Sequence, residues 1–267
     1  MLPELVLQLL TTAPRPLRRM GLVKDSIGLW SRGTRRRGDW LAHEERCHAA
    51  VRQALAGLTR RRTALVLGSG LLRDVPFPDL ARAFDRVILV DAVHLPMVRL
   101  AAGRHPRVTL LTRDLTGLSA WLAGEAQGRQ DPLGDLVADH SVDFVLSANV
   151  LSQLPLGVET FLDRNPARAK AMPPGLADRT VGWHLEDLAR FSGALCLLTD
   201  VEMREEDRAG RVTDRLDLMR GHALPVPDAA WDWPVAPFGE LERDRSYVHR
   251  VHAYRDWRRA RGLAKAG

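Results

Sequence analysis

The stretch ALVLGSGLLRDVPFP, residues 64–78, indicates the fold of this chain of 267 residues. An apolar segment runs into Gly68-Ser69-Gly70, and a polar loop with two prolines follows. Glycine at 68 and 70 suits a strand that turns sharply into a helix, because a side chain there would hold a ligand away from the backbone. Amides at the start of the next helix favour a polar or anionic group. On its own, the pattern fits either a cofactor loop or an ordinary tight turn.

Short apolar runs alternate with helical segments from Thr63 onward. Strands that are nearly continuous apolar runs, separated by helices, indicate a parallel sheet covered on both faces. Two later segments, rich in β-branched and aromatic residues, are expected to pair as an antiparallel hairpin at one edge. The predicted strands are residues 63–68, 86–91, 107–114, 142–149, 194–200, 231–240 and 246–254, and the helices among the first five are 80–84, 95–103, 118–122 and 184–191.

These elements predict an α/β fold. It is a Rossmann-like doubly wound sheet of about seven strands, mostly parallel with a C-terminal antiparallel hairpin, plus an N-terminal helical cap. We expect residues 1–60 to form this basic helical arm or cap and residues 61–267 to form the Rossmann-like domain. The first 62 residues hold 13 basic and 5 acidic side chains, so the positive charge belongs to the arm. Such an arm is either a solvated surface or a contact for RNA or an anionic membrane surface. The apolar residues 4–10 favour lipid over RNA.

The composition is that of an ordinary globular protein, with 45% hydrophobic and 27% charged residues. Cys47 and Cys196 lie far apart in the sequence and suggest neither a disulfide framework nor a zinc site. No stretch approaches the roughly 18 apolar residues of a spanning helix. We therefore expect a cytoplasmic protein.

Polar residues stand at the ends of three predicted strands. Asp91 ends the second strand, Asp114 the third and Asn149 the fourth. In a doubly wound sheet these carboxyl ends line one crevice where ligands bind, and Asp91 has the place of a carboxylate that accepts ribose hydroxyls. The alternative is that each aspartate belongs to a turn or caps a helix.

At these residues the sequence resembles the class I, Rossmann-like S-adenosylmethionine-dependent methyltransferases, from about Thr63 to Tyr254. The resemblance rests on LVLGSG (65–70), VILVDAVH (87–94), TRDL (112–115) and VDFVLSANVLSQLP (142–155). It implies that the glycine turn holds the methionine end of the cofactor. The cofactor-binding residues that we predict are Gly68, Ser69, Gly70, Asp74, Asp91, Ala92, His94, Asp114, Leu115, Asn149 and Leu151.

The same resemblance assigns a part of S-adenosylmethionine to each strand end. Asp91 would bind the ribose, Asp114 and the Leu115 amide the adenine edge, and Asn149 to Leu151 would pass close to the sulfonium. His94 is expected near the adenosine.

The chain also departs from the family pattern. The family usually has an acidic residue where this chain has Val66, and commonly a third glycine where it has Leu72. Asp74 is expected either to replace the lost carboxylate or to cap the following helix.

The resemblance predicts S-adenosylmethionine-dependent methylation of a small-molecule acceptor. The alternatives are a degenerate, non-catalytic methyltransferase-like domain, an RNA methyltransferase and an NAD(P)-dependent oxidoreductase. Arg73 opposes the last of these, because a dinucleotide fingerprint needs a small residue there.

No catalytic residue is obligatory for methyl transfer, since a base is needed only if the acceptor must lose a proton. His43 is a candidate base, or else a solvated histidine on the face of its helix. Ser152 is a candidate for orienting the acceptor, or else a capping serine. We expect His184 at the surface and His249 and His252 on opposite faces of the last strand. No metal site is expected, since Val201 follows Asp200 where a metal-dependent relative needs an Asp-Asn pair.

Overall fold

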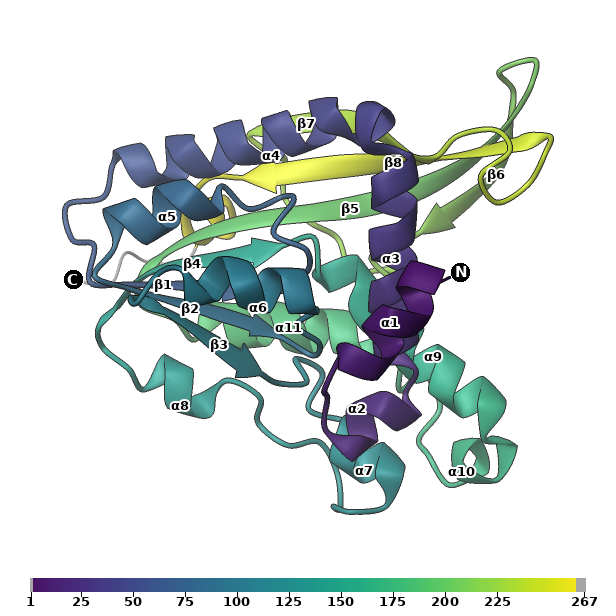
Figure 1. Ribbon diagram of the computed structural model, residues 1–267, viewed down its shortest axis with the longest axis horizontal. Helices are drawn as coiled ribbons and strands as arrows, with labels where there is room; N and C mark the ends of the chain where they lie inside the picture. The colour runs from purple at the N-terminus through teal and green to yellow at the C-terminus, as the bar shows by residue number, and fades with distance from the viewer. Residues whose placement is uncertain (1, 263–267) are drawn as a thin grey trace.

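A computed structural model describes residues 2–262 of the chain (Figure 1). It contains an eight-stranded sheet in the order β3-β2-β1-β4-β5-β8-β7, with β6 paired to β5. The strands β1 to β5 run parallel to one another, whereas β6 and β8 are antiparallel to β5, and β7 is antiparallel to β8. The strands are β1 (Thr63–Leu67), β2 (Arg86–Asp91), β3 (Val108–Thr112), β4 (Val142–Ala148), β5 (Ala194–Asp207), β6 (Val212–Asp217), β7 (Ala229–Ala236) and β8 (Arg245–Tyr254).

This topology confirms the predicted Rossmann-like fold, including the antiparallel C-terminal hairpin. Both faces of the central strands β1 and β4 are buried, as continuous apolar strands require. Ala64 and Val66 of β1 point into one core, whereas Leu65 and Leu67 point into the other. The helices from residue 37 onward are α4 (Arg37–Ala56), α5 (Phe77–Ala83), α6 (Pro96–Gly103), α7 (Ser119–Ala123), α8 (Gly134–Val137), η1 (Leu151–Gln153), α9 (Leu154–Arg164), α10 (Pro166–Lys170), α11 (Arg179–Ala189) and α12 (Trp257–Ala260).

Strand β5 is longer than the sequence analysis predicts. It continues from Asp200 to Asp207, and β6, which we did not predict, pairs with this extension. The far ends of β5, β6 and β8 project beyond the rest of the sheet (Figure 1). The extension is charged rather than apolar, so hydrophobic pattern alone misses it. Cross-strand ion pairs accompany it, such as Arg204 with Asp232 at 2.7 Å and Arg245 with Glu205 at 2.9 Å.

The N-terminal helices cover the edge where β1 to β4 end (Figure 1). They are α1 (Leu2–Leu10), α2 (Arg15–Arg19) and α3 (Leu22–Arg35). Val23 and Ile27 pack with Val93 and Leu95, which follow β2, and Met20 packs with residues of α7 and α9. The predicted cap is therefore present, and we call α1 to α3 the roof.

Helix α4 differs from the roof because it belongs to the main core. Its residues Trp40, Cys47 and Val51 lie in the same cluster as β1, β4 and β7. The boundary predicted at residue 60 stays a prediction. Within residues 2–262, none of the helices combines the length and the apolar character that crossing a membrane requires.

Candidate functional site

The Gly68–Gly70 turn is joined directly to the end of β2. The Gly70 amide donates to Oδ2 of Asp91 at 2.6 Å, and the Val93 amide donates to Oδ1 at 3.2 Å. Gly68 and Gly70 have φ angles of +74° and +49°, which favour glycine. Burial raises the pKa of the Asp91 carboxyl group, and the Gly70 amide opposes that shift. Two of the predicted strand-end features are thus in contact.

The two glycines are required for different reasons. A Cβ on Gly68 would lie 2.3 Å from Cβ of Val150, so the turn packs directly against the residues that follow β4. A Cβ on Gly70 would meet nothing closer than the Gly68 carbonyl oxygen, at 3.9 Å. The expected role of leaving room for a ligand therefore fits Gly70, whereas Gly68 makes room for Val150.

Asp114 stands apart from these contacts. Its Oδ1 accepts from the amide and hydroxyl of Thr116, and its Oδ2 accepts from the amides of Leu118 and Ser119 at the start of α7. These four donors match the capping alternative. The predicted contact of Asp114 with adenine stays a prediction, as does that of Leu115, whose side chain is buried in the core. Leu151 is likewise a core residue, and Ala92 packs beneath the roof.

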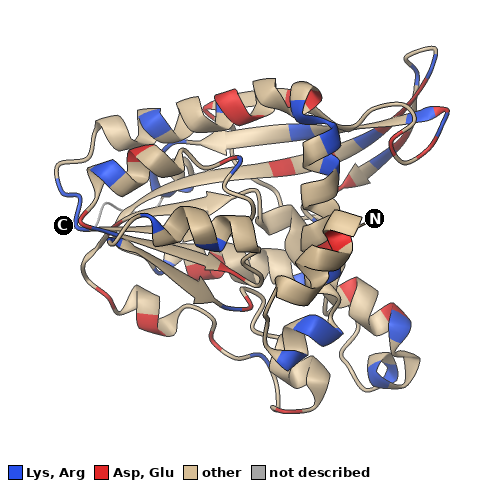
Figure 2. Ribbon diagram, in the orientation of Figure 1, with Lys and Arg blue, Asp and Glu red and all other residues tan. Residues whose placement is uncertain are grey.

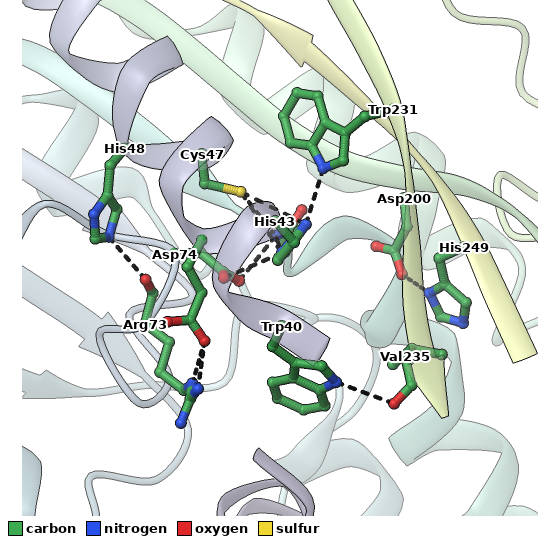
Figure 3. Close-up of polar contacts among 12 residues, drawn as sticks. Trp40, His43, Cys47, His48, Arg73, Asp74, Asp200, Trp231, Val235 and His249 are labelled. Atoms are coloured by element: carbon green, nitrogen blue, oxygen red, sulfur yellow. Dashed lines mark hydrogen bonds and ion pairs between the residues drawn. The ribbon is translucent and has the colours of Figure 1, made fainter. Parts of the chain in front are cut away.

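A buried cluster joins the turn to the end of β4 and to α4 (Figure 3). We call His43, Asp74 and Asn149 the closed cluster. Asn149 donates from Nδ2 to Oδ2 of Asp74 at 2.8 Å, and Nε2 of His43 lies 3.2 Å from Oδ1 of the same carboxylate. Burial of Asp74 acts to raise its pKa, but the contacts with His43 and Asn149 outweigh it and lower that pKa. Asp74 is therefore a carboxylate, and its side chain is 24% exposed.

The ring of His43 has no free nitrogen. Trp231 donates from Nε1 to Nδ1 of His43 at 3.1 Å, so Nδ1 carries the lone pair. The proton then lies on Nε2, where it is donated to Asp74. His43 is also buried and stacks on Trp233, with ring centroids 4.0 Å apart. This arrangement contradicts both sequence-based interpretations of His43, the general base and the solvated histidine.

Cys47 completes a group that resembles a metal site. Ligand atoms of His43, Cys47 and Asp74 all lie within 4.8 Å of one another. However, a histidine that binds a metal through Nε2 normally donates its Nδ1–H to a partner, whereas here Trp231 donates to Nδ1. Burial also raises the pKa of Cys47 well above its ordinary value and keeps it a neutral thiol. The residues therefore do not fit a metal ion.

A second histidine–carboxylate pair lies across Trp233 from the closed cluster. Oδ2 of Asp200 accepts a hydrogen bond from Nδ1 of His249 on β8, and Oδ1 accepts one from the Ser152 hydroxyl at 2.6 Å. The His249 ring lies edge-on to Trp233, with centroids 5.7 Å apart. We call Asp200 and His249 the open dyad. The Ser152 hydroxyl is thus hydrogen-bonded to a carboxylate. Neither predicted role of Ser152, orienting the acceptor or capping a helix, accounts for that contact.

Sequence analysis named both residues of the open dyad but did not connect them. One signal could have found the pair. Asp200 follows the parallel part of β5. Strand β8 of the hairpin is antiparallel to β5, so every second residue of β8 faces the same side of the sheet near Asp200. In the structure Asp200 pairs with Val251 and Met203 with His249.

Two polar side-chain atoms near the strand ends lack a hydrogen-bond partner among the residues described. They are Oγ of Ser69 and Oδ1 of Asn149, in side chains that are each 2% exposed. His94 is fully buried beside Asp91, and burial lowers the pKa of its ring despite that carboxylate. Since buried polar groups are normally hydrogen-bonded, these atoms indicate a place for a polar ligand or water.

His184 is a further correction. It is completely buried, not at the surface, and its Nε2 lies 3.0 Å from the Ser147 hydroxyl of β4. Burial lowers the pKa of this histidine to about 4.

Much of the basic charge of the N-terminal region is used within the chain. Arg35 and Arg36 both pair with Glu240, at 2.6 and 2.8 Å, and Arg18 donates to the Thr11 carbonyl. Figure 2 shows Lys and Arg residues spread over many elements of the molecule. These contacts account for part of the arginine run without RNA or lipid.

A groove of about 420 Å³ lies between α4 and β7. Small residues of both elements form its floor, and Arg46, Gln53, Asp228 and Arg255 flank it. None of the predicted cofactor residues lines this groove.

Comparison with known proteins gives structural similarity only. No protein-family model and no curated protein sequence matches the chain. The chain is similar to the Burkholderia thailandensis 1,6-didemethyltoxoflavin-N1-methyltransferase, solved with 1,6-didemethyltoxoflavin and S-adenosylhomocysteine. The identity is 18%, 89% of this chain and 88% of that chain are covered, and the TM-score is 0.41.

Two further solved structures give lower scores. The N-methyltransferase NodS from Bradyrhizobium japonicum, with S-adenosylhomocysteine, is 12% identical over 78% of this chain and 85% of that chain, with a TM-score of 0.35. The DhpI complex with SAH is 16% identical over 85% and 93%, with a TM-score of 0.36.

Proposed function

We propose that this protein is an S-adenosylmethionine-dependent methyltransferase that acts on a small molecule. The observation that carries the proposal is the convergence of three strand ends. The Gly70 amide meets Asp91 at 2.6 Å and Asp74 meets Asn149 at 2.8 Å, with unpartnered polar atoms on Ser69 and Asn149. The motif resemblance places these same residues around the cofactor.

The residues present fit the two ends of S-adenosylmethionine. Asp91 would accept from the ribose hydroxyls, and the Gly70 backbone leaves room for the methionine part. Asp74 is ionised and partly exposed beside the turn. This supports the role that the sequence suggests for it, which is to replace the acidic residue that the family usually has at the position of Val66. Its charge suits the methionine ammonium that Val66 cannot bind. When bound, the cofactor supplies a methyl group activated by a sulfonium.

The nicotinamide alternative is opposed by the position of Arg73. Its guanidinium pairs with Glu44 of α4 and lies over the Trp40 ring, 5.4 Å from the centroid. The turn is therefore tied to α4 at the point where a pyrophosphate site needs a small residue.

Calorimetric titrations with S-adenosylhomocysteine and with NADH test this proposal. We expect S-adenosylhomocysteine to bind and NADH not to bind. Asp91→Ala should weaken the binding of S-adenosylhomocysteine by about 1–3 kcal/mol, as expected for the loss of a charge-assisted hydrogen bond.

Asp85→Ala is the matched control, since Asp85 is exposed at the other end of β2. It should bind S-adenosylhomocysteine like the parent protein. If the parent protein did not bind S-adenosylhomocysteine, the proposed methyltransferase function would be contradicted. The alternative of a degenerate, non-catalytic domain would then remain.

A further inference from the structure

We propose that His249 is a general base that removes a proton from the acceptor, with Asp200 as its positioning residue. The acceptor class that this assigns is a weakly acidic hydroxyl compound, of which a phenol is the simplest case. This inference deepens the proposed function and depends on it for the identity of the methyl donor.

The first observation is the tautomer of His249. Its Nδ1–H donates to Asp200, so the lone pair of the neutral ring lies on Nε2. The His249 side chain is 16% exposed, and among residues 2–262 no hydrogen bond to its Nε2 is found. An available lone pair on an oriented imidazole is what proton abstraction requires.

The second observation is the state of the carboxylate. Asp200 is buried, which acts to raise its pKa, but His249 and the Ser152 hydroxyl outweigh burial and lower that pKa. Both of its oxygens are engaged, one by each partner. A fixed carboxylate behind the ring holds its orientation and stabilises the imidazolium that forms when Nε2 takes a proton.

The third observation is the place of the dyad in the fold. Leu198 of β5 pairs with Ala148 of β4, and Asp200 lies two residues further along β5. The dyad is therefore level with the segment after β4 that contains Ser152. Trp233 separates it from the closed cluster, touching the His43 ring on one side and the His249 ring on another. This puts His249 next to the proposed cofactor site without making it part of that site.

Trp233 adds a polar group to the same surroundings. Its side chain is 6% exposed, and its Nε1–H has no hydrogen-bond partner among the residues described. A buried donor without a partner is costly, so it is suited to an oxygen brought by a ligand. A hydroxyl compound provides such an oxygen.

The acceptor class follows from the chemistry of the step. The O–H bond breaks, the proton goes to Nε2 of His249 and the electron pair stays on the oxygen. The imidazolium pairs with Asp200 and later releases its proton to water. A tertiary amine or a thioether needs no such base. Among hydroxyl compounds, a phenol loses its proton to imidazole more readily than an aliphatic alcohol does, because it is more acidic.

The probe for this step is 4-nitrophenol, whose phenolate absorbs visible light. We would measure phenolate formation on adding protein, with and without S-adenosylhomocysteine, at a pH where the free phenol stays protonated. The parent protein should raise the phenolate signal. His249→Asn should lower that increase at least tenfold, because asparagine keeps a donor toward Asp200 but has no basic nitrogen.

His252→Asn is the matched control. His252 is on the same strand, facing the other way, with its Nδ1 3.2 Å from the Tyr254 hydroxyl. This variant should match the parent protein in phenolate signal, and both histidine variants should bind S-adenosylhomocysteine within about twofold of the parent affinity. A signal that persists in His249→Asn, or no signal with the parent protein, would overturn the assignment. Failure of the parent protein to bind S-adenosylhomocysteine would instead count against the proposed function.

Nitrogen NMR of histidine-labelled protein tests the positioning role without any ligand. His249 should appear as the Nδ1–H tautomer in the parent protein. Asp200→Asn, which no longer offers two acceptor oxygens, should shift the population toward the Nε2–H tautomer and lower the phenolate signal. An Nε2–H tautomer in the parent protein would overturn the proposal even if every variant misfolded.

Discussion

The closed cluster and the open dyad each contain a histidine–aspartate pair, and the two pairs lie on either side of Trp233. In the closed cluster, His43 donates from Nε2 to Asp74 and accepts from Trp231 at Nδ1, so both nitrogens are used. In the open dyad, His249 donates from Nδ1 to Asp200 and keeps Nε2 available. The comparison teaches that the second partner of the ring, not the carboxylate, separates a structural histidine from a reactive one.

The largest effect that we expect is on the stability of the closed cluster. His43→Ala should lower the free energy of unfolding by about 3–5 kcal/mol, the cost of truncating a large buried ring. It also leaves the Trp231 donor and the Asp74 carboxylate without their partner. Urea unfolding measures this loss.

His249→Ala is the counterpart in the open dyad. Because its ring is partly exposed and has one polar partner, we expect a loss of about 1–2 kcal/mol. Equal losses in the two variants would show that the two clusters are energetically alike and would break the comparison.

The pH dependence of stability adds a third histidine to the comparison. The folded-state pKa of His184 is about 4, below the value of about 6.5 in an unfolded chain. Between these values the unfolded chain binds the extra proton, so stability falls as pH falls from about 6.5 to about 4. This histidine should account for a loss of about 3 kcal/mol across that window.

His184→Gln isolates this contribution. The glutamine can still reach the Ser147 hydroxyl but does not take up a proton in this range. The parent protein and the variant should therefore differ in the slope of unfolding free energy against pH. His94 and His252 are present in both proteins, so their contributions do not affect this difference. Parallel curves would contradict the assigned pKa of His184.

The smallest expected effect concerns the tryptophans. Trp231→Phe removes the donor to His43, whereas Trp233→Phe removes a donor for which residues 2–262 offer no partner. We expect the first variant to be less stable than the second by about 0.5–1.5 kcal/mol, the net value of one hydrogen bond. Thermal unfolding of the two proteins measures the difference. The reverse order of stability would mean that the Trp231 contact does not fix the tautomer of His43.

The central strands of the sheet were predictable because each has a recognisable apolar sequence pattern. Residues 63–67 and 142–148 are short apolar runs, and burial on both faces requires that pattern. The meeting of Asp91 with the glycine turn was also predictable, since parallel strand ends share one edge. The charged extension of β5 was not, because ion pairs across strands rather than burial accompany it.

The functional histidine could not be chosen from the sequence. His43 has a helix position beside the crevice, and His249 lies in a strand that looks ordinary. What separates them is the partner of the second ring nitrogen, and Trp231 comes to His43 from 188 residues away. A tautomer that depends on such a long-range contact cannot be predicted from the residues that surround the histidine in the sequence.

The roof has a consequence for how a bound nucleoside would exchange with solvent. Because α1 to α3 cross the ends of the strands and pack on Val93, Leu95, α7 and α9, they would cover one side of a nucleoside bound beneath them. The residence time of such a nucleoside would then depend on the packing of these three helices as well as on its own contacts.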